Sequence, residues 1–110
     1  MADKSPYVLV SVFKEDANAQ DVAQAAGKIA TIIDEWNMQG NMIWSGSFDD
    51  NKTAMSVIEG TQSDVDVFFK KYDDACKSFL SSYMYQWDAM PLLSLIGHKQ
   101  ASATLEVAPQ

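Results

Sequence analysis

The hydrophobic positions along this chain follow two different periods, one close to two residues and one close to 3.6. Residues 6–13 begin with a proline and are rich in β-branched and aromatic side chains, a composition that predicts a first strand. From residue 18 to residue 36 the apolar positions recur in steps of three and four, which predicts an amphipathic helix. Gly40 follows the last periodic position and is expected to end this helix.

A hairpin and a second helix are predicted next. Residues 41–48 and 52–59 have strand composition and are separated by a short turn rich in aspartate and asparagine. Thr61 or Ser63 is then suited to cap a helix, whose apolar positions repeat at helical spacing up to about Ser81. The middle of the chain therefore predicts two strands followed by a helix.

The last part of the chain is expected to complete the sheet. Residues 83–90 alternate as a fourth strand, and Pro91 interrupts it. Residues 92–96 are interpreted as a continuation of that strand after a bend or bulge. The remainder, residues 97–110, is expected to be a polar tail, in which residues 102–107 either form a short edge strand, stay loose or dock on a partner subunit.

The predicted order of elements is βαββαβ, within one domain at residues 6–96 after a short tail at residues 1–5. This order is typical of the ferredoxin-like α+β sandwich, in which two helices pack on one face of a four-stranded antiparallel sheet. A chain of 110 residues has room for one such core and for no second core of ordinary size.

Several of the predicted strands are apolar on both of their faces. The first strand alternates Val8, Val10 and Val12 with Tyr7 and Leu9, and the fourth strand gathers three aromatic residues on one side. Strands of this kind are normally buried on both faces, but two helices cover only one face of a sheet. The sequence therefore predicts self-association. It leaves open which face meets the helices, because the register of the hairpin is not fixed by the pattern.

Composition and charge exclude several classes of function. Fifteen acidic residues against eight basic residues give a formal net charge of -7, and every basic residue is a lysine. This excess of negative charge argues against a protein that binds nucleic acids or anionic membranes. A single cysteine, Cys76, cannot form a disulfide within the chain, and a single histidine, His98, cannot form a multi-histidine metal site. Neither a metal nor another cofactor is expected. A beginning without an apolar signal segment favours a cytoplasmic protein.

The order of elements, the length and the double-sided strands resemble the dimeric α/β-barrel superfamily of ferredoxin-like proteins across residues 6–96. The resemblance implies a homodimer in which two sheets pack face to face with the helices outside. It also implies a pocket between the helices and the sheet. The superfamily includes monooxygenases of antibiotic biosynthesis, polyketide cyclases and haem-degrading enzymes, together with stress-responsive barrel proteins.

Only some of the functional residues expected in these relatives have a counterpart in this chain. The haem-degrading members are expected to have a Trp and a His on the second helix and an Asn in the first strand, and this chain has none of them at those places. No haem cofactor is therefore expected. The cyclase-like members use a Tyr/His pair for proton transfer, and Tyr72 and His98 are of the matching types.

The residues themselves suggest a small set of candidates for a site. Trp44, Tyr85 and Trp87 lie on predicted strands and are suited, with Tyr72, to line an apolar ligand site, while packing in a core or a dimer interface is the competing interpretation. Tyr72, Asp88 and His98 are the candidates for proton transfer, although each is also explained as an ordinary core or surface residue.

Three functional hypotheses follow from these features. The leading one is a small homodimer, or higher oligomer, that binds an apolar or aromatic small molecule or has an accessory role without evident catalytic machinery. The second is a cofactor-independent monooxygenase or a polyketide-cyclase-like enzyme acting on an aromatic substrate. The third is a structural or regulatory interaction module. An RNA-recognition domain shares the βαββαβ order, but its third strand carries aromatic residues, and residues 52–59 contain none.

Overall fold

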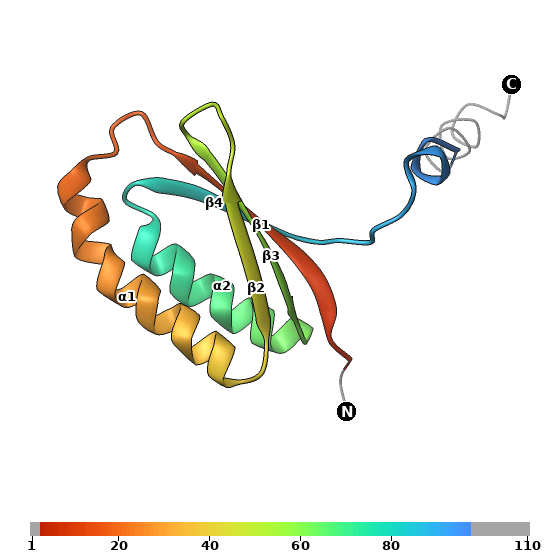
Figure 1. Cartoon of the computed structure of the whole chain (residues 1–110). Coiled ribbons are helices and arrows are strands. Elements are labelled where there is room, and N and C mark those ends of the chain that lie inside the picture. The colour runs from red at the N-terminus through yellow and green to blue at the C-terminus, as the bar shows by residue number, and fades with distance from the viewer. Residues whose placement is uncertain (1–2, 98–110) are drawn as a thin grey trace, which may run out of the picture.

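The computed structural model describes residues 3–97, and its elements follow the order βαββαβ (Figure 1). The elements are β1 (Ser5–Phe13), α1 (Ala19–Met38), β2 (Met42–Ser47), β3 (Thr53–Gly60), α2 (Gln62–Cys76) and β4 (Leu80–Gln86). This layout confirms the predicted fold class, a ferredoxin-like α+β fold. Within the described residues, no helix is long and apolar enough to cross a membrane.

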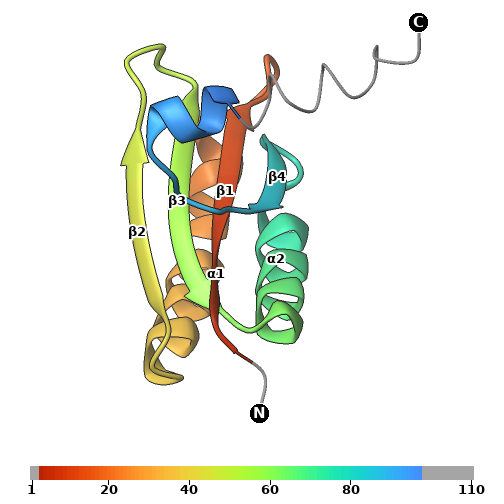
Figure 2. The same cartoon turned by 90° about the vertical axis from the view of Figure 1, so that its right-hand side faces the viewer.

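The four strands form one antiparallel sheet in the order β2-β3-β1-β4. β1 and β3 are the two central strands, and β2 and β4 are the edge strands. Both helices cover the same face of this sheet, and Figure 2 shows the other face turned toward the viewer. We call that other face, which no helix covers, the open face.

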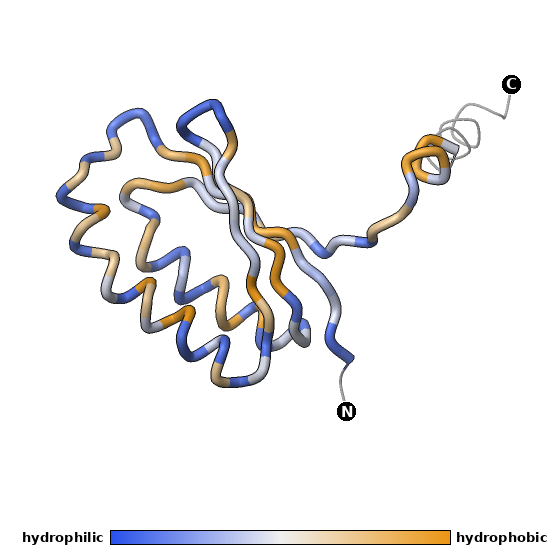
Figure 3. Tube along the Cα trace, viewed as in Figure 1, coloured by the Kyte–Doolittle hydropathy of each residue, from blue (hydrophilic) through white to orange (hydrophobic). Residues whose placement is uncertain are grey.

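The end of the chain differs from the sequence prediction. The fourth strand runs from Leu80 to Gln86 rather than over residues 83–90, because α2 already ends at Cys76 and Leu80 pairs with Phe13 of β1. The predicted continuation of the strand after Pro91 is also wrong: residues 92–97 are helical. Proline suits the start of a helical turn, and the Leu95 N–H donates to the Pro91 carbonyl at 3.0 Å. Figure 3 shows this short apolar helix standing apart from the sheet.

Both helices begin at the residues that the sequence suggested. The Asn18 side chain accepts a hydrogen bond from the Asp21 N–H at 2.9 Å, and Thr61 accepts one from the Asp64 N–H at 3.2 Å. Thr61 rather than Ser63 is therefore the cap of α2. Gly40 ends the first helix with a φ of 78°, a left-handed conformation that glycine adopts without strain.

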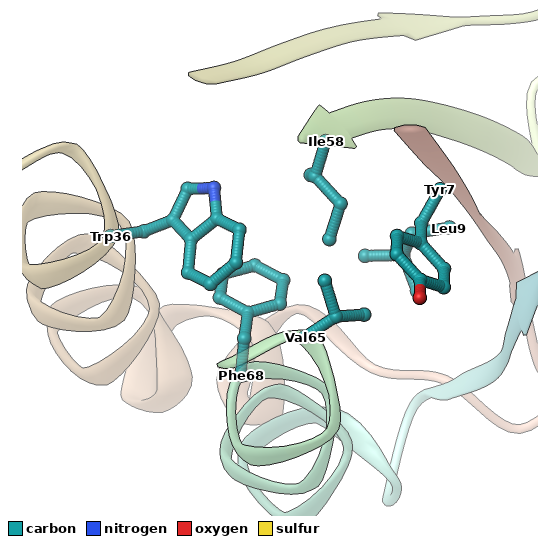
Figure 4. Close-up of a cluster of buried hydrophobic side chains, with 6 residues drawn as sticks. All are labelled: Tyr7, Leu9, Trp36, Ile58, Val65 and Phe68. Atoms are coloured by element: carbon teal, nitrogen blue, oxygen red, sulfur yellow. The ribbon is translucent and has the colours of Figure 1, made fainter. Parts of the chain in front are cut away.

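The core lies between the helices and the sheet. Figure 4 shows its larger cluster, which contains Tyr7, Leu9, Trp36, Ile58, Val65 and Phe68. Trp36 is 3% exposed, and its indole N–H donates to the Met42 carbonyl at 3.1 Å. A Cβ at Gly60 would lie 2.6 Å from the Trp36 ring, so this position requires glycine for the close approach. A second cluster, at the other end of the sandwich, contains Ala25, Cys76, Phe79 and Leu80.

Candidate functional site

The register of the sheet decides which residues share the open face. Tyr7, Leu9 and Ser11 are buried toward the helices, so the alternate residues of β1 point away from them. Val8 pairs with Val57 on one side and with Tyr85 on the other, and Val57 pairs with Trp44. The side chains of all four strands therefore form a row across the open face, from an indole on one edge to a phenol on the other.

A second row lies beside the first. It contains Gly46, Met55, Val10 and Tyr83, again one residue from each strand. At the end of the sheet where β4 finishes, the Trp87 N–H donates to the Pro6 carbonyl at 3.0 Å and extends the ladder by one residue. The alternation of β4 thus places Trp87 on the open face with Tyr83 and Tyr85.

Aromatic side chains on the open face are unusually exposed. Trp44 is 76% exposed, and the others are between 46% and 57% exposed: Phe48, Tyr83, Tyr85 and Trp87. At about 200 Å² for each aromatic side chain, these five expose about 550 Å² of mostly apolar surface. Monomeric proteins rarely expose a contiguous apolar area larger than a few hundred Å². The open face is therefore a surface that a partner is expected to cover.

Gly46 leaves a hollow in the open face. Trp44 of β2 and Phe48, which follows the strand, flank the position, and Met55 of β3 is paired beside it. The hollow has a volume of about 200 Å³, and apart from residues 45–47 no described atom lies within 4 Å of where a Cβ of Gly46 would stand. We call this hollow, lined by Trp44, Gly46, Phe48, Met55 and Val57, the Gly46 notch. It is an apolar recess at the edge strand of the sheet.

Tyr72 lies on the opposite side of the sheet from the aromatic rows. It packs from α2 into both core clusters, and its hydroxyl lies 3.0 Å from the Ser11 hydroxyl, which in turn lies 3.3 Å from that of Ser82. Burial raises the pKa of the Tyr72 phenol above its usual value, and the hydrogen bond with Ser11 offsets part of the rise. The four residues predicted to line one ligand site are thus divided between two faces, because the sheet separates Tyr72 from Trp44, Tyr85 and Trp87.

Of the other two candidates for proton transfer, the structure places one, Asp88, and it lies apart from Tyr72. Asp88 lies beyond the end of β4, exposed in the segment that leaves the sheet, rather than within a strand. His98 lies outside the residues that the structure describes. Within residues 3–97, no group of three or more His, Cys, Asp or Glu side chains is placed to hold a metal ion. Of the candidates within residues 3–97, Tyr72 and Asp88 therefore form no acid–base pair with each other.

A pocket opens between α2 and the sheet beside β4, and the sequence singled out none of the residues that line it. It has a volume of about 360 Å³, within the range of small-molecule sites. Apolar and polar side chains share its lining: Tyr7, Val65, Phe69 and Met84 with Gln62, Asp66 and Gln86. We call it the α2–β4 pocket. Its residues carry no sequence signal of a site, because each one individually fits a strand or an amphipathic helix.

Comparison with known proteins identifies the fold and no family. No protein-family model and no curated protein matches the sequence. Among solved structures, the oxygenase SnoaB from Streptomyces nogalater, described as cofactor-independent, is 10% identical with a TM-score of 0.52, covering 84% of this chain and 98% of that one. Ribosomal protein S6 from Thermotoga maritima is 6% identical with a TM-score of 0.50, covering 92% and 99%. The designed protein Ferredog-Diesel is 8% identical with a TM-score of 0.51, covering 78% and 87%. These similarities support a ferredoxin-like fold.

Proposed function

We propose that this protein is a homodimer of the dimeric α/β-barrel type, in which two open faces pack against each other and the helices lie outside. The observation that carries this proposal is the row of exposed aromatic and aliphatic side chains across all four strands. A second copy of the chain is the partner, because an isologous contact lets the same apolar face cover itself.

The size and composition of the open face fit such a contact. An ordinary stable interface buries about 800 Å² on each partner, and the five aromatic side chains alone supply about 550 Å². The cores of protein interfaces are depleted of charged residues. On the four described strands, the charged residue of the open face is Glu59, which pairs with Met42 of β2. The central strands offer Val8, Val10 and Val57, which pack well as the middle of a sheet-on-sheet contact.

The function of the dimer, in this proposal, is to bind a small apolar or aromatic molecule in the α2–β4 pocket. Phe69 and Met84, both half-buried, supply the apolar part of the lining, which suits one face of a ring system. Gln62, Asp66 and Gln86 supply hydrogen-bonding groups, and the Asp66 carboxylate favours a ligand that donates a hydroxyl or amine proton. Each protomer carries one such pocket, on the side of the sheet away from the dimer contact.

Native mass spectrometry of the freshly purified protein tests both parts of the proposal. The expected result is a species of twice the 12.2 kDa chain mass, with additional mass where a ligand is retained. Titration with 1-naphthol, followed by calorimetry, then tests the pocket directly. We expect Gln86→Trp, at an exposed position of the pocket lining, to weaken that binding, while the matched control Gln20→Trp on α1 leaves it unchanged. A monomeric mass contradicts the dimer, and equal naphthol binding by both variants contradicts the pocket.

A second candidate function is a cofactor-independent oxygenase or cyclase acting on an aromatic substrate. The observation that favours it is that Tyr7 and Asp66, two residues able to exchange protons, line the same pocket. The fold shared with SnoaB is consistent with this activity but does not carry it. Oxygen uptake with polycyclic phenols, lost in Tyr7→Phe and Asp66→Asn, is the expected result. No uptake by the unaltered protein contradicts the candidate.

A further inference from the structure

Three side chains of α2 that line the α2–β4 pocket follow one another at helical spacing. Gln62, Asp66 and Phe69 are separated by four and three residues, so they lie on one face of the helix. Across the pocket, β4 supplies Met84 and Gln86. The helix face turned to the pocket thus carries an amide, a carboxylate and an aromatic ring in succession.

The charged group of this lining is a carboxylate. Of the described residues that line the pocket, Asp66 is the acidic one and none is a lysine. The ion pairs within residues 3–97 join Lys71 to Glu35 and Lys77 to Asp74, so Asp66 takes part in neither. A carboxylate only accepts hydrogen bonds, so its charge is left for a ligand that donates them.

A protonated amine matches these groups. An ammonium group has three N–H donors and no acceptor, and the Asp66 carboxylate with the side-chain oxygens of Gln62 and Gln86 offers enough acceptors for all three. An aromatic ring next to the ammonium suits Phe69 and Met84, because rings pack favourably against other rings and against thioethers. A carboxylate or phosphate on the ligand would instead meet the like charge of Asp66.

The end of the molecule around the pocket is negatively charged. β1 begins there, β3 ends there and α2 begins there (Figure 2), and the pairing of Tyr7 with Gln86 brings the end of β4 close to it. Residues 3–7, 58–66 and 84–88 contain five acids and one lysine: Asp3, Lys4, Glu59, Asp64, Asp66 and Asp88. The Lys4 ammonium donates to the Gly40 carbonyl at 3.2 Å. The field of this end therefore attracts cations and repels anions.

An anionic aromatic molecule is the competing class of ligand. Gln62 is the first residue of α2, and the N-terminus of a helix by itself attracts negative charge. However, Asp64 already lies in the first turn of α2, and its N–H already donates to Thr61 at 3.2 Å. Because Asp64 offsets the positive end of the helix dipole and Asp66 lines the pocket itself, the charges favour a cation.

We propose that the α2–β4 pocket binds a protonated aromatic amine, with the ammonium group at Asp66 and the ring against Phe69 and Met84. This inference rests on the ligand pocket of the proposed function and narrows its ligand to one charge class. It does not depend on the dimer, because the pocket lies on the helix-covered side of the sheet.

Three naphthalene probes that differ in charge test this assignment on the full chain. They are the cation 1-naphthylmethylamine, the neutral 1-naphthalenemethanol and the anion 1-naphthoate. Calorimetric titration at low salt is expected to show the amine bound about fivefold more tightly than the alcohol, and the anion bound more weakly than both. Because Asp66 is exposed, salt screens its charge, and the preference is expected to fall below about twofold in about 0.5 M sodium chloride.

Three variants assign the preference to this pocket. Asp66→Asn is expected to abolish the preference for the amine while the alcohol still binds. The matched control Asp34→Asn removes the same charge from an exposed position on α1 and is expected to keep the preference. Gln86→Trp, in the lining of the pocket, is expected to weaken the binding of both the amine and the alcohol.

Two results overturn the cation assignment. One is an amine that binds no more tightly than the alcohol, and the other is an equal loss of the preference in Asp66→Asn and Asp34→Asn. If the alcohol binds in either case and Gln86→Trp weakens it, the pocket of the proposed function stands without this inference. If no probe binds, or if Gln86→Trp weakens none of them, the pocket and the inference fail together.

Discussion

Replacing Trp44 by serine tests how much of the dimer contact the open face supplies. The side chain lies on an edge strand and is 76% exposed in the single chain, so its loss leaves the core untouched. At about 200 Å² for a tryptophan, about 150 Å² is available to a partner. At 25 cal/mol per Å², full burial of that area contributes about 4 kcal/mol for each copy.

The expected loss is smaller than this upper value, because truncating a hot-spot residue, a class in which tryptophan is enriched, costs about 2 kcal/mol or more. Each dimer contains two copies of Trp44, so Trp44→Ser is expected to weaken dimerisation by about 4 kcal/mol, or about a thousandfold in Kd. Sedimentation velocity over a concentration series measures this change, and far-UV circular dichroism verifies that the fold is retained.

The matched control is Val67→Ser, because Val67 is 56% exposed on α2 and lies outside the open face. The control is expected to leave Kd within threefold of the unaltered protein. If Trp44→Ser also stays within threefold, the reasoning is refuted, because the largest exposed side chain of the open face then contributes nothing to assembly.

Three further predictions concern the core and are tested by thermal or denaturant unfolding. Gly60→Ala is expected to destabilise the fold by about 1–3 kcal/mol, because its Cβ would lie 2.6 Å from the Trp36 ring; an unchanged stability contradicts this close approach. Tyr72→Phe removes the hydrogen bond to Ser11 and is expected to cost about 1 kcal/mol without changing the dimer; a weakened dimer contradicts the placement of Tyr72 behind the sheet. Burial raises the pKa of the Cys76 thiol from 9.0 to about 11, so the folded state holds this proton more tightly than the unfolded state. The resulting stability is present below pH 9 and is lost between pH 9 and about 11. Cys76→Ala is expected to flatten the fall of Tm over that interval, and an equal slope contradicts the burial effect.

The sequence was sufficient for the order of the elements, because each element has a clear period and a recognisable beginning. The apolar residues of the first helix recur in steps of three and four up to Trp36, and Asn18 and Thr61 cap the two helices. These features depend on residues close together in the sequence, so they can be recognised without knowledge of the tertiary structure. The open face was also foreseeable as a problem, since β1 has apolar residues on both of its sides.

The position of Tyr72 relative to Trp44 was not foreseeable. Alternation along a strand tells which residues share a face, but it does not tell which face meets the helices when both are apolar. The register that places Trp44, Val57, Val8 and Tyr85 in one row comes from pairing between strands that are distant in sequence. The helical turn after Pro91 was missed for a similar reason, because a short apolar run fits a strand and a helix equally well.

Oxidative footprinting of methionines tests the central claim, that a second copy covers the open face. Met42 lies on the open face and is 64% exposed in the single chain, whereas Met38, at the end of α1, is 86% exposed and lies away from it. The two residues have the same chemistry, so their exposed fractions alone predict nearly equal rates of oxidation by a short pulse of hydroxyl radicals. We expect Met42 to be oxidised much more slowly than Met38 at micromolar concentration, and we expect the difference to disappear on dilution. Nearly equal rates at every concentration would contradict the dimer, because the open face would then be bare in solution.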